Sequence, residues 1–259
     1  MLELVANCSL LFTEFDLYDR PSAARAAGFN QIELWWPWST PVPDDGEVDR
    51  LVSAVTGAGV QLAGLNFFAG DLAGPDCGAL SVPEFSEGFS RNVPVVVDIA
   101  ERLGTRLFNA LYGNRDDGIS SELQDELAAE NLALAADAVR HLGGVILIEP
   151  VSGPKPYPLR TAADAASVVL AARSAGVTNV GMLLDIYHLA ANGDDVGRAI
   201  EHHIGMIEHV QIADAPGRGE PGSGLLDLDG YVRCLERHGY RGAIALEYKP
   251  TGATSDGLS

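Results

Sequence analysis

The sequence has few basic residues, and this shortage excludes one class of binding partner. The 259-residue chain has 17 lysines and arginines against 36 aspartates and glutamates, which gives a formal net charge of −19 at pH 7. Proteins that bind nucleic acids usually carry a basic surface, because each phosphate contact needs a cation. The charge balance therefore argues against a nucleic-acid partner, and we expect none.

Cysteines and long apolar runs are also scarce. The three cysteines, Cys8, Cys77 and Cys234, are widely spaced and form neither a disulfide framework nor a CxxC metal motif. No run of 18 apolar residues occurs, and the first residues lack a basic segment before Glu14, so we predict neither a membrane span nor a signal peptide. We expect a cytoplasmic protein that does not contact a membrane.

The chain instead contains a regular alternation of short and long apolar segments. The short runs are rich in β-formers, whereas the longer segments place apolar residues at helical spacing. The predicted strands cover residues 2–7, 31–36, 60–68, 106–112, 145–150, 180–188, 209–214 and 243–250. Helices are predicted at residues 46–59, 89–104, 121–143, 161–176, 194–206 and 228–239. Several end in glycine, for example Gly59 and Gly104, because glycine tolerates the left-handed cap of a helix.

This order of elements predicts the fold class. Strands that alternate strictly with helices run parallel and are joined by right-handed crossovers. Eight such units without an intervening linker predict one α/β domain, a (β/α)8 TIM barrel over residues 1–259. A doubly wound open sheet is the alternative, but no GxGxxG motif follows the first strand. We expect the tail, residues 251–259, to leave the last strand along the surface.

Polar residues end the last four predicted strands, where a barrel places its active site. They are Glu149, Asp185, Gln211 and Glu247. Acids that converge in a protein interior repel one another unless a cation lies among them. A ligand set made only of oxygen atoms favours a hard ion, Mg²⁺ or Mn²⁺, over Zn²⁺. The sequence therefore predicts a divalent metal site at the mouth of the barrel.

Further charged residues follow these strands and are candidates for binding an anionic substrate. His188 comes just after the sixth strand, and Lys155 lies in a proline-rich loop after the fifth. Residues 214–224 hold Arg218 and Glu220 among glycines and prolines, and we interpret this loop as a mobile cover that excludes water. Each residue alone is typical of a packed or solvated side chain; their shared position at the mouth is the argument for function.

Polar and aromatic residues on the first four strands are weaker candidates. Amide and carboxyl groups occur at Asn7, Glu33, Asn66 and Asn109, where they could line the bottom or the mouth of the pocket. Trp35 and its aromatic neighbours follow the second strand and could wall the site against water, although aromatic residues there are about as often part of the core.

Several segments resemble one enzyme family. The stretches are ANCSLLFTEFDLYDRPSAARAAGFNQIELWWP, GPKPYPL, HVQIADAPGRGEPGSG, EYKP and TSDGL, and the resemblance covers nearly the whole chain. On these segments the chain resembles hydroxypyruvate isomerases, within the xylose-isomerase-like sugar isomerases and epimerases. The resemblance implies that the metal ligands are Glu149, Asp185, Gln211 and Glu247 and that both glutamates are also the acid/base pair. Related keto-sugar epimerases usually have histidine where Gln211 stands, which favours the hydroxypyruvate isomerase branch.

The resemblance also implies an activity. It is the interconversion of hydroxypyruvate and 2-hydroxy-3-oxopropanoate through an enediolate, without a redox cofactor, and with His188 and Arg218 in contact with the substrate. A related sugar or 2-oxo-tetronate isomerase, or a ketose 3-epimerase, is the alternative. An endonuclease IV-type nuclease and a non-catalytic binding module are less favoured. The expected partner is a small hydroxy-oxo acid or sugar, and the sequence leaves open a homo-oligomer.

Overall fold

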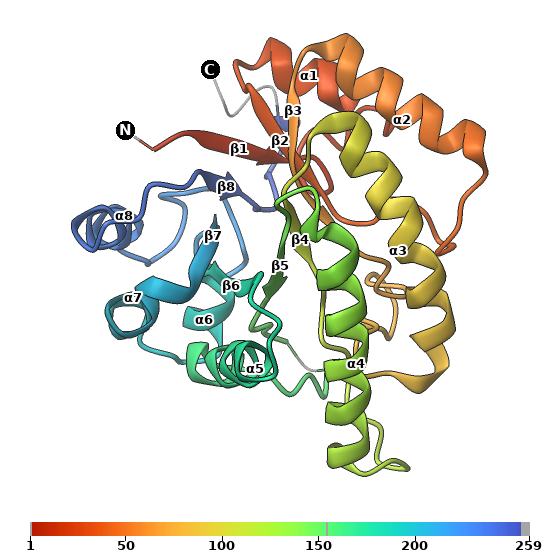
Figure 1. The fold of residues 1–259 in the computed structure, drawn as a ribbon. Coiled ribbons are helices and arrows are strands. Elements are labelled where there is room, and N and C mark those ends of the chain that lie inside the picture. Colours follow the sequence, from red (N-terminus) through yellow and green to blue (C-terminus); the bar gives the residue numbers. More distant parts are fainter. Residues whose placement is uncertain (1, 154, 255–259) are drawn as a thin grey trace.

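The computed structural model describes residues 2–153 and 155–254 and contains a closed barrel of parallel strands (Figure 1). Each strand pairs with the next along the chain, and the last pairs with the first, with Ala6 opposite Leu246. The strands are β1 (Leu4–Asn7), β2 (Gln31–Leu34), β3 (Gln61–Asn66), β4 (Leu107–Asn109), β5 (Val145–Ile148), β6 (Val180–Asp185), β7 (Ile207–Ile212) and β8 (Ile244–Leu246). The predicted TIM barrel is confirmed, and the open sheet is excluded.

Helices follow the strands and cover the outside of the barrel (Figure 1). They are α1 (Arg20–Ala26), α2 (Asp45–Ala58), α3 (Pro83–Leu103), α4 (Ser121–Arg140), α5 (Ala162–Ser174), α6 (Ile186–Ala191), α7 (Val196–His203), the 3₁₀ helix η1 (Ile204–Met206) and α8 (Leu228–Arg237). In the part of the chain that the structure describes, no helix has both the length and the apolar character needed to cross a membrane.

Local signals explain where several helices begin and end. The Ser120 side chain accepts a hydrogen bond from a backbone N–H in the first turn of α4, and Thr161 and Asp164 form a capping box at the start of α5. Gly59 and Gly104 end α2 and α3 with φ values of 68° and 73°. These left-handed conformations confirm the predicted glycine caps.

Several predicted strands were too long; residues 106–112, for example, form a strand only over Leu107–Asn109. The segment 180–188 is a strand only as far as Asp185, where the chain turns directly into α6. The Asp185 side chain accepts a hydrogen bond from the His188 backbone N–H at 3.0 Å, so one aspartate both ends the strand and caps the helix. A six-residue helix has too few turns to show a helical period in the sequence. Helix α3 also begins earlier than predicted, at Pro83 rather than residue 89.

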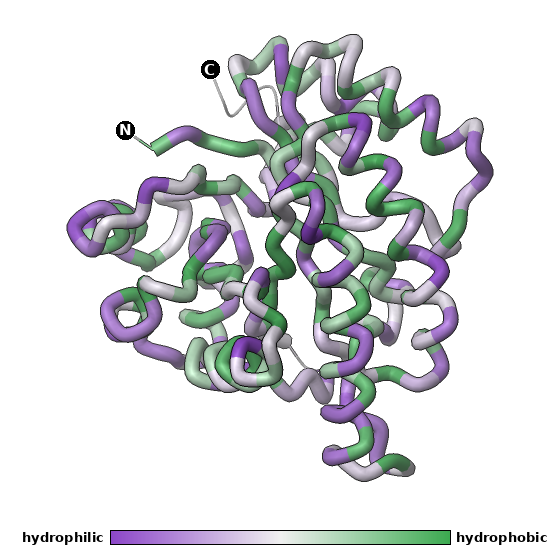
Figure 2. The backbone as a smooth tube through the Cα atoms, viewed as in Figure 1, coloured by the Kyte–Doolittle hydropathy of each residue, from purple (hydrophilic) through white to green (hydrophobic). Residues whose placement is uncertain are grey.

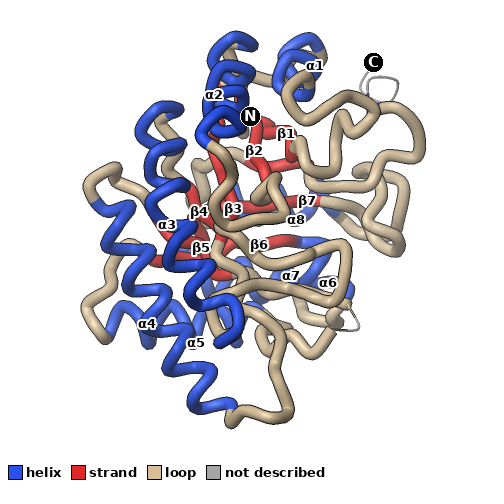
Figure 3. The backbone as a smooth tube through the Cα atoms, turned by 90° about the vertical axis from the view of Figure 1, so that its right-hand side faces the viewer, coloured by secondary structure: helices blue, strands red, loops and turns tan. Residues whose placement is uncertain are grey.

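Apolar residues fill the interior, and polar side chains collect at one end of the barrel. Hydrophobic segments lie toward the centre in Figure 2, and the long connections gather on one side in Figure 3. The tail was expected at the surface, but Thr254 is buried, and its hydroxyl accepts a hydrogen bond from the Phe12 N–H at 2.7 Å. The tail therefore packs back against the loop after β1; residues 255–259, with most of the TSDGL segment, lie outside the described residues.

Candidate active site

Each barrel strand places a buried polar side chain within one position of its last residue. These residues are Asn7, Glu33, Asn66, Asn109, Glu149, Asp185, Gln211 and Glu247. A cavity of about 170 Å³ lies at this end, and Trp35, Glu149, His188, Arg218 and Glu247 are among the residues that line it. The mouth of the barrel is therefore the place where polar chemistry is possible.

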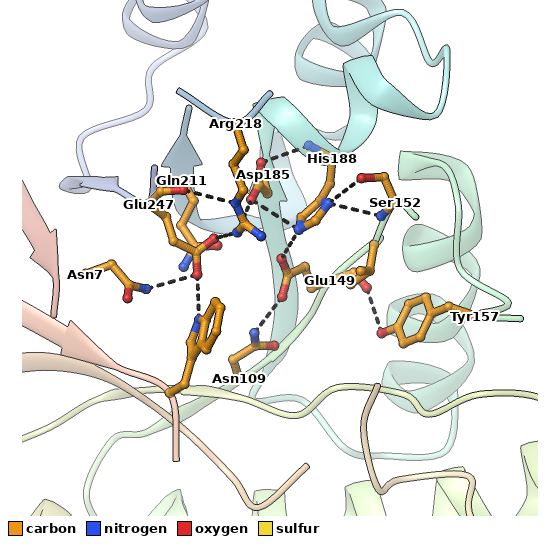
Figure 4. Close-up of polar contacts among 12 residues, drawn as sticks. Asn7, Asn109, Glu149, Ser152, Tyr157, Asp185, His188, Gln211, Arg218 and Glu247 are labelled. Atoms are coloured by element: carbon orange, nitrogen blue, oxygen red, sulfur yellow. Dashed lines mark hydrogen bonds and ion pairs between the residues drawn. The ribbon is translucent and has the colours of Figure 1, made fainter. Parts of the chain in front are cut away.

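Three buried acids converge beside this cavity (Figure 4). Ligand atoms of Glu149, Asp185, His188 and Glu247 all lie within 4.8 Å of one another. Burial, assisted by the charge of Asp185, raises the pKa of Glu149 to about 8, and burial raises the pKa of Glu247 well above its usual value. Burial is the main cause of both shifts, and a bound cation would lower both pKa values.

Two buried oxygen atoms in this cluster are candidate metal ligands. Asp185 Oδ2 and Gln211 Oε1 have no hydrogen-bond partner among the described residues. Asp185 and Gln211 lie opposite each other in the pairing of β6 with β7, and Figure 4 shows Gln211 beside Glu247. Because buried polar atoms are normally paired, such oxygens fit a site that binds a hard cation. The residues present therefore suit Mg²⁺ or Mn²⁺.

His188 is oriented as a hydrogen-bond donor. Its Nδ1 accepts the Ser152 backbone N–H at 3.0 Å and lies 2.7 Å from the Ser152 hydroxyl oxygen. Burial lowers the pKa of His188 to about 4, so the ring is neutral and carries its proton on Nε2. This Nε2 lies 3.7 Å from Asp185 Oδ2 and 3.9 Å from Glu149 Oε1. A protonated Nε2 cannot bind a metal, but it can donate to a substrate oxygen.

Arg218 reaches back from the loop after β7 onto the acidic cluster. Its guanidinium pairs with the Glu247 carboxylate, donates through Nε to the Glu247 backbone carbonyl at 3.1 Å, and lies 3.5 Å from Asp185 Oδ2. Burial alone would lower the pKa of Arg218, but the charges of Glu247 and Asp185 outweigh it and raise that pKa. Arg218 has a left-handed φ of 59°, which is unusual for a residue with a side chain. The backbone therefore supports this orientation at a cost in strain.

Hydrogen bonds join the two arms of the loop that carries Arg218 and tie it to the chain after β8, and its role as a mobile cover stays a prediction. Asp214 is buried and accepts hydrogen bonds from the backbone N–H of Ala215 on one arm of the loop and from those of Gly222 and Leu226 on the other. Glu220 Oε1 accepts from the Thr251 N–H and hydroxyl at 2.8 and 3.0 Å. Glu220 thus ties the loop to the chain after β8, and it is not among the residues that line the cavity.

Lys155 lines the cavity and joins two loops across it. Its ammonium group donates to the backbone carbonyls of Leu72 and Asp76 at 3.3 and 2.5 Å. Both carbonyls belong to the connection between β3 and α3. Lys155 therefore forms part of one wall of the cavity and places a positive charge close to it.

Donors that orient the two glutamates were only weakly indicated by the sequence. Asn109 donates to Glu149 Oε2 at 2.7 Å, and Glu247 Oε1 accepts from Asn7 at 2.9 Å and from the Trp35 indole at 2.6 Å. Ser152 and His209, which hold His188 and Glu33, were not singled out at all. A serine in a loop and a histidine within a strand carry no local signal, since only the tertiary contact gives them a role.

Comparison with known proteins decides the family. The model of the xylose isomerase-like TIM barrel family matches residues 21–259. The chain belongs to this family. A putative hydroxypyruvate isomerase of Streptomyces coelicolor is 50% identical over 249 residues, 94% of this chain and 89% of that protein. The hydroxypyruvate isomerase of Escherichia coli is 30% identical and covers 100% of this chain and 97% of its own.

A solved structure described as an AP endonuclease, family 2, from Brucella melitensis has a TM-score of 0.87 and 29% identity, covering 100% of this chain and 97% of its own. The family predicted from the sequence is thus confirmed, and the two relatives place the chain among the isomerases.

Proposed function

We propose that the chain interconverts hydroxypyruvate and 2-hydroxy-3-oxopropanoate with the help of a divalent metal ion. The observation that carries this proposal is the cluster of three buried acids, Glu149, Asp185 and Glu247, around a small cavity with Arg218 on its wall. The reaction needs proton carriers beside the substrate carbons and a cation near its oxygens. Two relatives that cover nearly all of this chain are named for the same substrate.

The metal would be held by oxygen atoms of Glu149, Asp185, Gln211 and Glu247. A divalent ion bound there supplies Lewis-acid stabilisation of the negative charge that develops on two adjacent substrate oxygens. Asp185 Oδ2 and Gln211 Oε1, which accept no hydrogen bond among the described residues, support this ligand set. His188 is left out of it because Ser152 holds its ring in the tautomer that donates from Nε2.

Glu149 and Glu247 are the proposed proton carriers. The reaction removes a proton from the carbon that bears the hydroxyl group and returns one to the former carbonyl carbon, while the hydroxyl proton moves to the other oxygen. Both oxygens of Glu247 accept hydrogen bonds, whereas only Oε2 of Glu149 does so among the described residues. This asymmetry favours Oε1 of Glu149 as the atom that takes the first proton.

Positive and neutral donors around the cavity would bind the rest of the substrate. Arg218 and Lys155 face it with cationic groups that suit a carboxylate, with Arg218 capable of a bidentate contact. His188 would donate from Nε2 to a substrate oxygen. The carboxylate of Glu220 accepts hydrogen bonds from Thr251, and contact between Glu220 and the substrate stays a prediction.

The test is turnover of hydroxypyruvate by the purified protein, followed by NMR of substrate and product. We expect conversion that stops after exhaustive chelation and returns with Mg²⁺ or Mn²⁺. Full turnover in metal-free protein would contradict the role of the metal. A protein inactive on hydroxypyruvate but active on another member of a panel of C3 to C6 hydroxy-oxo acids and sugars would support the alternative isomerase or epimerase.

The same preparation also tests the nuclease alternative. Incubation with a duplex that contains abasic sites should leave the DNA intact, because a chain with a net charge of −19 repels a phosphate backbone. Cleavage that depends on added metal would instead support the activity for which the Brucella melitensis protein is named.

A further inference from the structure

Glu33 is a buried carboxylate that the proposed reaction does not use. It lies on β2, is 4% exposed, and accepts hydrogen bonds on both oxygens. Gln211 Nε2 and Asn7 Nδ2 donate to Oε1 at 2.7 and 2.9 Å, and His209 Nε2 lies 2.7 Å from Oε2. A carboxylate costs free energy in the interior unless such partners compensate for its lost hydration. The presence of a buried carboxylate at this position therefore indicates that Glu33 has a role in the site.

The orientation of the Gln211 side chain is what Glu33 can control. A carboxamide presents an oxygen on one side and an NH₂ group of nearly the same size on the other, so either could face the acidic cluster. A carboxylate only accepts hydrogen bonds and therefore binds the NH₂ side. With Nε2 held by Glu33, the buried Oε1 of Gln211 is left without a partner among the described residues.

We infer that Glu33 is a positioning residue that selects the metal-binding orientation of the Gln211 amide. This inference rests on the proposed function, in which Gln211 is a metal ligand. A reversed amide would direct an NH₂ group at the cation and remove one of the four ligand oxygens. Groups that orient metal ligands from behind typically account for about 10- to 100-fold in metal affinity.

The backbone around Glu33 is shaped to place it inside the barrel. The pairing of β2 with β3 shifts register between Ile32 and Glu33, an irregularity that redirects side chains. Gly64 on β3 lies over it, and a Cβ at that position would be 3.4 Å from Glu33 Cβ. Asn7 Nδ2 also donates to Glu247 Oε1 at 2.9 Å, but the Trp35 indole donates to the same oxygen, so Glu247 keeps an orienting donor when Glu33 is replaced.

The experiment measures Mn²⁺ affinity by calorimetry in a double-mutant cycle of Glu33→Met and Gln211→Ala. Methionine has a similar length but accepts no strong hydrogen bond, so we expect Glu33→Met to weaken Mn²⁺ binding about 10- to 100-fold. Gln211→Ala should lose a comparable amount. The double variant should bind about as well as Gln211→Ala alone, because Glu33 acts through the amide that is already missing.

A matched control is available at an exposed position where β1 and β2 begin. Glu3 Oε2 accepts from Gln31 Nε2 at 2.9 Å, which is the same contact in an exposed position. Glu3→Gln should leave Mn²⁺ affinity unchanged. Glu33→Gln keeps an acceptor oxygen and should restore most of the affinity lost in Glu33→Met. If Glu33→Met does not fold, Glu33→Gln takes its place in the cycle. The small loss of Mn²⁺ affinity caused by Glu33→Gln should then disappear in the Gln211→Ala background.

The outcomes separate this inference from the proposed function. Tight Mn²⁺ binding by the wild type and by Glu33→Met would overturn the inference alone. If the fold-losses of Mn²⁺ affinity in the two single variants multiply in the double variant, the inference is also overturned, because Glu33 would then act independently of Gln211. A wild-type protein that binds no Mn²⁺ would overturn both the inference and the metal site of the proposed function.

Discussion

The two halves of the barrel contribute opposite kinds of group to the same site. Strands β5 to β8 bring mainly acceptors, and these are Glu149, Asp185, Gln211 and Glu247. Strands β1 to β4 bring mainly amides, with one acid among them, and these are Asn7, Glu33, Asn66 and Asn109. Asn7 donates to Glu247 and Asn109 donates to Glu149. The first half therefore orients the carboxylates on which the proposed chemistry of the second half depends.

This division shows that a cluster of buried carboxylates needs hydrogen-bond donors that orient it, in addition to cations that balance its charge. A carboxylate has several lone-pair sites, and donors on one oxygen leave the other to face the substrate. Asn7 and Glu247 are 240 positions apart along the chain and meet because β1 closes the barrel onto β8. The comparison predicts large effects for changes in the acceptor half and smaller ones for changes in the donor half.

The largest effect is expected in the acceptor half, for Glu149→Gln. Loss of a general base typically costs about 10²- to 10⁴-fold, so kcat for hydroxypyruvate should fall by that factor. The variant should melt no lower than the wild type without metal, because a group whose pKa is raised to about 8 by burial is not a stabilising charge. Kinetics and thermal melts of both proteins test this, and an unchanged kcat would remove Glu149 from the proton transfer.

Arg218→Ala should have the next largest effect. The guanidinium pairs with Glu247 and Arg218 lines the cavity, so its loss should remove the proposed charge-assisted contact with the substrate carboxylate. Such contacts contribute about 1.5–3 kcal/mol, and KM should rise roughly 10- to 100-fold. Arg233→Ala, which removes an exposed arginine on α8, is the control and should leave KM unchanged. Equal kinetics for Arg218→Ala and the wild type would exclude it from substrate binding.

In the donor half, Asn109→Leu should reduce kcat by about tenfold, the equivalent of one lost hydrogen bond to a buried charge. Asn109 lowers the pKa of Glu149 through its contact with Oε2, so its removal raises that pKa further and leaves the carboxylate less firmly oriented. Gln124→Leu serves as control because Gln124 is a buried amide on α4 that contacts loop carbonyls instead. If both variants show the wild-type kcat, the donor half has no orienting role.

Trp35→Phe should have the smallest effect, a reduction of kcat of a few-fold. A smaller aromatic ring replaces the indole and the N–H that donates to Glu247 Oε1 is lost, while Asn7 still donates to the same oxygen. Trp36→Phe is a closely matched control, since that indole donates to the Thr40 carbonyl. A loss in Trp35→Phe as great as in Glu149→Gln would show that the comparison between the halves is wrong.

Much of the fold could be predicted because its signals are local. Each short apolar run predicted a strand, and the glycines after α2 and α3 have the expected left-handed conformation. The errors lie where local signals compete. Asp185 reads as the interior of a strand that continues to His188, yet the same side chain caps α6 and turns the chain there.

The candidate site was predictable to the extent that its residues follow apolar strands. A polar residue after three or four apolar ones is visible in the sequence, and so Glu149, Asp185 and Glu247 could be named in advance. Gln211 follows a single apolar residue, Val210, and was named only together with the other three. The tautomer of His188 could not, because it depends on a serine 36 positions away. The contact of the loop after β7 with the chain end was likewise not predictable, because Thr251 lies 31 positions beyond Glu220.

The sequence by itself determined the alternation of strands and helices and which residue types stand at the strand ends, because both depend on neighbours a few positions away. Only the tertiary structure decided which oxygen of each carboxylate is held and which faces the cavity. Those directions come from donors on strands that meet through closure and register of the barrel. A hydrogen bond depends on distance and angle, and neither is defined for distant residues until the barrel has closed.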